Sequence, residues 1–258
     1  MVYVKRAKPI LKRTNILYAG IACLLLGPVS ASVRAQDIAV SGQIEISRAA
    51  KNGQAAAKAE SAGNVAVWLT PLENGADTSA HRVTGRIAQL VQKNKKFDPH
   101  LLIVEVGSRV EFPNKDPFFH NVFSLFNGKR FDLGLYEAGS SNSVRFDRAG
   151  ISYLFCNIHP EMSAIVVSVP TPYYGVSNGA GKIAIPAVPS GRYRLHVWSE
   201  RSSPEDLAKL ERDVVISESS RTLEPIRVVE SIAPELSHKN MYGKDYVPPT
   251  NSPGYTHP

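Results

Sequence analysis

Apolar and polar residues alternate in short runs along most of this chain, and a period of two is the pattern of half-buried β-strands. In residues 38–46 the side chains of Ile38, Val40 and Ile44 are separated by small or polar residues. Residues 65–69 form a second, continuous apolar run, which ends before Pro71. Both runs predict strands.

The same signals recur at short intervals between residues 87 and 169, with glycine-containing turns between them. Strands are predicted at residues 101–106, 110–112, 122–126, 144–146, 151–155 and 164–169. Several short strands joined by turns predict an antiparallel β-sandwich.

The remainder of the chain adds more β-structure and one helix. Further strands are expected at residues 182–185, 193–197, 214–216 and 226–229. Ser203 followed by Pro204 and two acidic residues is typical of a helix start. We expect loops at residues 49–63 and 73–86 and a flexible, proline-rich tail at residues 231–258. The expected fold class is all-β.

Residues 1–35 have the pattern of a secretory signal peptide. Five basic residues precede an apolar run at residues 16–26, and small residues follow up to Ala31 and Ala35, the two expected cleavage positions. The alternative is an uncleaved membrane anchor, for which the run is short. We therefore expect export to the periplasm, with no stable membrane span after cleavage.

Composition and charge narrow the function classes. The whole chain has a net charge of +7, but residues 1–35 hold six of the 30 Lys and Arg and none of the 23 Asp and Glu. The remainder carries only +1, so the charge does not indicate nucleic-acid binding. Cys23 lies in the apolar run and Cys156 is the only other cysteine, which excludes a disulfide scaffold and any four-thiolate metal site.

One short segment combines three metal-binding side chains. Cys156, His159 and Met162 follow an apolar strand with the spacing Cys-x2-His-x2-Met, and His120 follows another strand that could bring it alongside. Two His, one Cys and a weak axial Met describe a mononuclear type 1 copper site. Each residue alone has a simpler explanation, as a core thiol, a surface histidine or an apolar filler. The joint spacing favours copper.

Other chemistries fit these residues less well. Zinc prefers more thiolate or imidazole ligands and gains little from a thioether. A binuclear copper site needs a second cysteine. A Cys/His hydrolase needs an orienting group and an oxyanion hole, which nothing in the sequence marks.

Residues 150–167 resemble the ligand loop of the cupredoxins, in the short Cys-x2-His-Pro-x-Met form of amicyanin, and His120-Asn121-Val122 resembles their first-histidine motif. Over residues 85–200 the chain is similar to periplasmic cupredoxin-like proteins named for methylamine utilisation. The segments that carry this likeness begin at Phe112, His120, Cys156, Thr171 and Gly191. The family name does not show that methylamine is involved.

The resemblance implies a Greek-key cupredoxin sandwich holding one type 1 copper ion, with His120, Cys156 and His159 as equatorial ligands and Met162 as the axial ligand. Asn121 would tie the two ligand loops together by hydrogen bonds. An outer-sphere electron carrier, not an enzyme, is implied, with the His159 edge as the exit and redox proteins docking transiently. The apolar patch around that edge would be built from Pro117, Phe118, Phe119, Ile158 and Pro160. The bulky pair Phe118-Phe119 departs from small cupredoxins.

A second resemblance concerns the flanking strands. Residues 36–75 and 170–230 resemble the two halves of a small carboxypeptidase-regulatory-like β-sandwich, so that a cupredoxin domain at residues 85–169 would be inserted in it. The alternative is that residues 38–69 supply edge strands of the cupredoxin itself.

Three rival functions remain open from the sequence. The protein could bind or handle copper without shuttling electrons, or it could be a cell-envelope binding module whose copper is incidental. It could also be a copper enzyme, although such enzymes use an additional catalytic copper and no second His cluster is visible.

Overall fold

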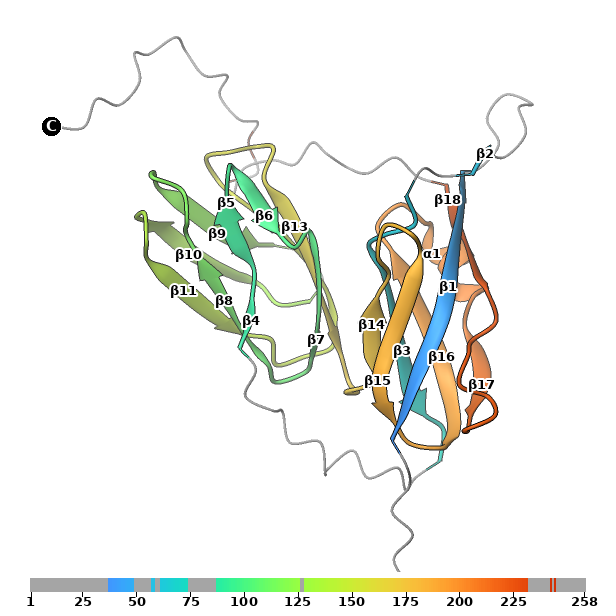
Figure 1. Ribbon diagram of the computed structural model, residues 1–258. Helices are drawn as coiled ribbons and strands as arrows, with labels where there is room; N and C mark the ends of the chain where they lie inside the picture. Colours follow the sequence, from blue (N-terminus) through green and yellow to red (C-terminus); the bar gives the residue numbers. More distant parts are fainter. Residues whose placement is uncertain are drawn as a thin grey trace, which may run out of the picture. The chain divides into compact units, whose positions relative to one another are not determined.

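In this computed structural model the described residues are 37–48, 57–58, 61–73, 87–125, 128–231, 242 and 244. They form short strands and one helix of five residues, so the expected all-β fold is confirmed (Figure 1). The expected signal peptide, most of the tail beyond residue 231 and most of the two long loops lie outside these residues.

The strands before residue 114 are β1 (Ile38–Arg48), β2 (Ala57–Lys58), β3 (Val65–Pro71), β4 (Ala88–Gln89), β5 (Val91–Lys93), β6 (Lys96–Asp98), β7 (Leu101–Glu105) and β8 (Arg109–Pro113). The next are β9 (His120–Ser124), β10 (Phe131–Tyr136), β11 (Ser141–Arg145), β12 (Gly150–Phe155) and β13 (Ser163–Val169). The last elements are β14 (Tyr174–Val176), β15 (Lys182–Val188), β16 (Gly191–Ser199), α1 (Pro204–Ala208), β17 (Arg212–Ile216) and β18 (Ile226–Glu230).

One pair of sheets, here called the first sandwich, is built from residues 38–71 and 174–230. Its sheets have the strand orders β15-β1-β18, with β2 also on β1, and β14-β3-β16-β17. The apolar positions of β1 alternate inward, as the sequence predicts, and pack against β3 and β16 in one core. The likeness of this sandwich to a carboxypeptidase-regulatory-like module stays a prediction.

A second pair of sheets, the second sandwich, is built from residues 88–169. Its sheets have the orders β10-β9-β12-β13-β7 and β11-β8-β4, and β5 and β6 form a separate hairpin. Large apolar side chains such as Phe112, Phe146 and Leu154 fill its core. Cys156 and Met162 belong to the same buried cluster, which places the candidate ligands at the edge of this core.

The predicted antiparallel sandwich also contains parallel strand pairs. Strand β13 pairs in parallel with β7, and β4 pairs in parallel with β8. In the first sandwich β1 also pairs in parallel with β18. Each parallel pair joins strands that are far apart in the sequence, because neighbours joined by a tight turn can only be antiparallel.

Local sequence signals predicted the ends of most of the expected elements to within a few residues of their observed positions. Helix α1 begins after Ser203, whose hydroxyl accepts a hydrogen bond from the Asp206 backbone N–H, and Pro204 occupies the first turn. Strand β9 begins at His120, two residues before the expected strand. Strand β10 was not expected, since Gly134 interrupts its alternation with a φ of 66° and the register with β9 shifts there.

Candidate metal centre

The structure brings three of the predicted ligand side chains together. His120 Nδ1 lies 3.1 Å from His159 Nδ1, and Cys156 Sγ lies 3.8 Å from the first nitrogen and 3.5 Å from the second. His120 opens β9 and Cys156 follows β12, and these neighbouring strands pair at Phe123 and Phe155. The cluster of three ligand side chains therefore lies where the start of β9 and the end of β12 meet.

The separations suit a metal ion. A sulfur about 2.3 Å and two nitrogens about 2.0 Å from one metal lie roughly 3 to 4 Å from one another in a trigonal or tetrahedral set. The three observed distances, 3.1, 3.5 and 3.8 Å, all fall in that range. In the part of the chain that the structure describes, this is the one group of three or more His, Cys, Asp or Glu close enough to hold an ion.

Burial sets the protonation states of the cluster. Cys156 and His120 are fully buried, whereas His159 is half-buried. Burial raises the pKa of the Cys156 thiol, although backbone N–H groups of Asn121, Ile158 and His159 partly oppose the rise. Burial, helped by the neighbouring His120, lowers the pKa of His159. Near pH 7 the metal-free site therefore holds a thiol and a neutral His159, and a metal would displace the thiol proton.

Met162 closes the loop that begins at Cys156. The Cys156 N–H donates to the Met162 carbonyl (3.3 Å), and the Met162 N–H donates to the His159 carbonyl (3.0 Å). The Met162 side chain is fully buried in the cluster that also contains Cys156. These backbone contacts close the loop, and they keep Met162 in the same buried cluster as Cys156.

Asn121 joins three segments of the second sandwich. Its Oδ1 accepts the backbone N–H of Asn157 (3.2 Å), in the loop that follows Cys156. Its Nδ2 donates to Asp132 Oδ1 (2.7 Å) and to the Gly134 carbonyl (3.0 Å), both in β10. Because Asn121 is nearly fully buried, these bonds tie the histidine strand to the cysteine loop without competition from water.

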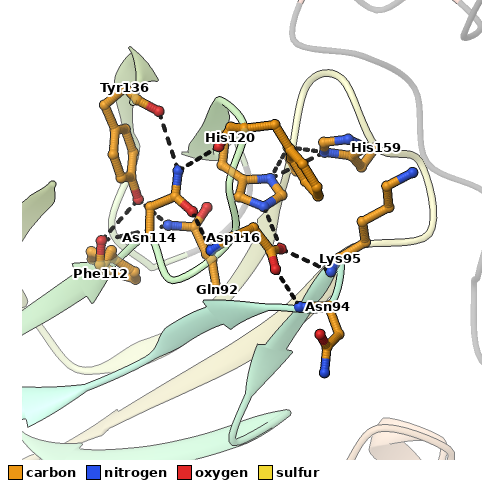
Figure 2. Close-up of polar contacts among 11 residues, drawn as sticks. Gln92, Asn94, Lys95, Phe112, Asn114, Asp116, His120, Tyr136 and His159 are labelled. Atoms are coloured by element: carbon orange, nitrogen blue, oxygen red, sulfur yellow. Dashed lines mark hydrogen bonds and ion pairs between the residues drawn. The ribbon is translucent and has the colours of Figure 1, made fainter. Parts of the chain in front are cut away.

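Asp116 is a residue of the site that the sequence analysis missed. Its Oδ2 lies 2.8 Å from His120 Nε2 (Figure 2), whereas Cys156 lies near the other ring nitrogen, Nδ1. Burial raises the pKa of Asp116, but hydrogen bonds from Lys95, His120 and Asn94 outweigh it and hold the pKa below its usual range. Asp116 ends the segment from Phe112 that carries the family likeness, but neither this nor its position four residues before His120 indicates a contact with the histidine.

Asn114 shapes the loop that carries Asp116. Its Oδ1 accepts the Asp116 backbone N–H (3.0 Å), and its Nδ2 donates to the carbonyls of Phe118 (2.8 Å) and Tyr136 (3.4 Å). The side chain is completely buried, and Figure 2 shows it between Tyr136 and His120. The segment between β8 and β9 is thus folded around one amide.

The predicted apolar patch divides into one half-buried and several exposed residues. Phe118 is half-buried, with its ring centroid 5.2 Å from that of His120 and 5.6 Å from that of His159. Phe119 is 55% exposed and Ile158 is 43% exposed, and Pro117 and Pro160 are also exposed. Lys95 Nζ lies 5.7 Å from the Phe118 ring centroid, so a cation adjoins the patch.

Fold and site together define an all-β protein with one Cys and two His gathered at the end of a β-sandwich. The chain is similar to a Cu-containing nitrite reductase from Thermus scotoductus SA-01, with 23% identity and a TM-score of 0.31 over 32% of this chain and 22% of that chain. It is also similar to a purple cupredoxin from Nitrosopumilus maritimus, with 24% identity and a TM-score of 0.29 over 32% of this chain and 99% of that chain.

A third similar structure is the Cu(I) form of an amicyanin mutant, with 22% identity and a TM-score of 0.31 over 40% of this chain and 99% of that chain. No family model matches the chain, and no curated protein matches it. Within the described residues, no helix has the length and apolarity needed to cross a membrane.

Proposed function

We propose that the protein binds one copper ion through His120, Cys156 and His159, with Met162 as a weak axial ligand, and that it acts as an exported electron carrier. The observation that carries this proposal is the approach of three donor atoms to within 3.1 to 3.8 Å of one another at the edge of a buried core. Residues 1–35 support export to the periplasm.

The donor set favours copper over zinc. A thiolate and a thioether are soft ligands, and a trigonal His2Cys set with a distant Met is the arrangement of blue-copper sites. Bound there, copper would supply a one-electron couple between Cu(II) and Cu(I). Zinc gains little from the thioether that this chain buries in the same cluster as the cysteine.

The surrounding residues would hold the ligands still while the charge changes. Cys156 accepts hydrogen bonds from backbone N–H groups. Asn121 ties the loop that follows Cys156 to β9, and backbone hydrogen bonds close this loop at Met162. A set of ligands fixed by the fold reorganises little when an electron arrives or leaves, and this lowers the barrier to transfer. No bound substrate is turned over in this proposal, so the protein would not be an enzyme.

His159 is the proposed point of electron exit. It is half-buried, unlike His120, and the exposed side chains of Phe119 and Ile158 lie in the segments that hold the two histidines. A small apolar surface suits brief docking of a redox protein, since such encounters bury little area. Neither a nucleic acid nor a membrane is a proposed partner.

A copper titration of the purified full chain tests the metal part of the proposal. Cu(II) should produce an intense visible thiolate-to-copper band that Cys156→Ser abolishes. Asn121→Ala should only perturb this band, because the asparagine positions the ligand loop without supplying a donor atom. Met162→Leu is the matched control for burial, and it should keep a band with a shifted maximum. A colourless complex, or a band indifferent to Cys156, would overturn the proposal.

Electron self-exchange tests the carrier part. In a mixture of Cu(I) and Cu(II) protein, NMR line widths of residues near His159 should broaden with concentration as electrons pass between molecules. A copper-loaded protein whose lines stay independent of concentration, and which does not oxidise or reduce redox proteins, would be a copper-handling protein instead.

A further inference from the structure

A buried carboxylate lies directly behind one of the candidate ligands. Asp116 is 5% exposed and His120 is fully buried, and Oδ2 of the first lies 2.8 Å from Nε2 of the second. A carboxylate only accepts hydrogen bonds, so the proton of this contact belongs to Nε2. In the tautomer with this proton on Nε2, the lone pair is on Nδ1, the atom that faces Cys156 and His159.

The hairpin of β5 and β6 holds the carboxylate in place. Its two-residue turn, Asn94-Lys95, has a φ of 55° at both positions, which directs two successive backbone N–H groups the same way. The Asn94 N–H donates to Asp116 Oδ1 (2.6 Å) and the Lys95 N–H donates to Oδ2 (2.9 Å) (Figure 2). The carboxylate is therefore fixed by backbone atoms and cannot swing away from His120.

The charge of Asp116 is not cancelled by a cationic side chain. Among the residues that the structure describes, its carboxylate is hydrogen-bonded to the His120 ring and to the backbone N–H groups of Asn94 and Lys95. The nearby Lys95 instead directs Nζ over the Phe118 ring. A full negative charge thus lies one imidazole ring away from the proposed metal position, in a buried environment where screening by water is weak.

We propose that Asp116 is a positioning residue that fixes the Nε2–H tautomer of His120 and, through its charge, lowers the Cu(II)/Cu(I) potential of the centre. This inference rests on the proposed function. A carboxylate partner on the remote nitrogen orients a ligating histidine and makes it a stronger donor. Both the stronger donor and the negative charge favour the doubly charged ion over the singly charged one, so reduction becomes harder.

The test is the midpoint potential of copper-loaded Asp116→Asn, with Asp147→Asn as the matched control. Asparagine keeps the size and one acceptor oxygen of Asp116 but removes its charge. Asp147 forms an exposed ion pair with Lys129, and the six residues of β12 separate it from Cys156 by about 20 Å of extended chain. That separation is about two Debye lengths at 0.1 M salt, so D147N controls for net charge alone.

We expect D116N to favour Cu(I) over Cu(II) about tenfold more than the wild type, a rise of about 59 mV for a one-electron couple. The D147N potential should equal that of the wild type. An unchanged potential in folded, blue D116N, or an equal rise in D147N, would overturn the proposal.

A second measurement does not depend on copper or on the stability of the variant. In the metal-free wild type, 15N NMR of His120 at neutral pH should find the ring proton on Nε2. A proton on Nδ1 with a bare Nε2 would contradict the positioning role, even if D116N fails to fold. A wild type that binds no copper would instead overturn the proposed function and the effect on the potential, and the NMR result would still decide whether Asp116 sets the tautomer.

Discussion

The two sandwiches of this protein are built alike but treat buried polar groups differently. The first sandwich encloses aliphatic side chains and two tyrosines, and its buried polar residues are small hydroxyl side chains, among them Ser177, which bonds to backbone atoms. The second sandwich buries Asp116, His120 and Cys156 at one edge of an equally apolar core. Burying these three side chains costs more free energy than burying apolar ones.

This difference indicates that the first sandwich is built for stability, whereas the edge of the second is built for ligand binding. Burying titratable groups costs free energy unless every group finds a partner, and an apolar filling of the same volume is often more stable. Among its described residues the first sandwich buries no acid, histidine or cysteine, whereas the second buries all three and offsets the cost with Asn114, Asn121 and two backbone N–H groups. The edge of the second sandwich is therefore the place where ligand binding should change the stability of the molecule.

Cavities of matched size should affect the two sandwiches equally in stability and unequally in metal binding. Leu154 in β12 and Ile185 in β15 are both completely buried. Leu154→Ala and Ile185→Ala should each destabilise the metal-free protein by about 2 to 5 kcal/mol in urea unfolding. Only Leu154→Ala should also weaken copper binding, because Leu154 lies two residues before Cys156 in the strand that positions it. Equal copper affinities for the two variants would contradict the division of roles.

Copper should stabilise the second sandwich alone. At a free copper concentration one hundred times Kd, binding to the native state contributes about 2.7 kcal/mol. Amide hydrogen exchange should therefore slow in β9 and β12 more than in β1 and β16, and Cys156→Ser should show no such protection. Uniform slowing across both sandwiches would mean that they unfold as one unit, and equal protection in the Cys156→Ser variant would place the metal elsewhere.

Much of this architecture follows from local sequence. The alternation of apolar and polar residues identified most strands. The spacing of Cys156, His159 and Met162 placed three candidate ligands on one loop, because a segment of seven residues keeps their side chains close together. His120 could be added because it follows a predicted strand, residues 110–112, which could pack beside the strand that precedes Cys156. The structure brings His120, Cys156 and His159 together through a different strand, because His120 begins β9 and it is β9 that pairs with β12.

The sequence resemblance predicted that Asn121 ties the two ligand loops together, and its bond to the Asn157 N–H does so. The support that Asp116 and Asn114 give to the site did not follow from sequence, and the reason is physical. The carboxylate of Asp116 meets His120 only because Asn114 folds the intervening loop, and it is held by a turn more than twenty residues earlier in the chain. Parallel pairing of β7 with β13 likewise depends on tertiary packing. Hydrogen bonds between distant segments do not produce a periodic pattern of residues, so they cannot be recognised from the sequence in the way that strands can.

The first sandwich should respond to alkaline pH through Tyr193. Burial and the neighbouring Tyr173 raise the pKa of Tyr193 to about 12, above the ordinary value of 10. A raised pKa means that the folded state holds the phenol proton more tightly. The resulting stability is complete below pH 10 and is lost as the pH rises towards about 12.

Tyr193→Phe should remove this alkaline loss and cost about 1 kcal/mol at neutral pH, because the hydrogen bond from Tyr193 Oη to the Pro189 carbonyl disappears. Urea unfolding at pH 8 and pH 11 measures both effects. If the variant lost as much stability between these pH values as the wild type, another group would be responsible.

The smallest effect on stability and the clearest effect on electron transfer should come from one exposed ring. Phe119 directly precedes His120 and is 55% exposed, and Val215 of the first sandwich is 60% exposed, so the two residues form a matched pair. Phe119→Ala and Val215→Ala should each change the free energy of unfolding by no more than about 0.5 kcal/mol and leave the visible copper band unchanged. Only Phe119→Ala should slow electron self-exchange, because the contact between two molecules would form around His159. If the two variants exchanged electrons at the same rate, the docking surface would not include Phe119. The surfaces of the two sandwiches would then not differ in function at this residue.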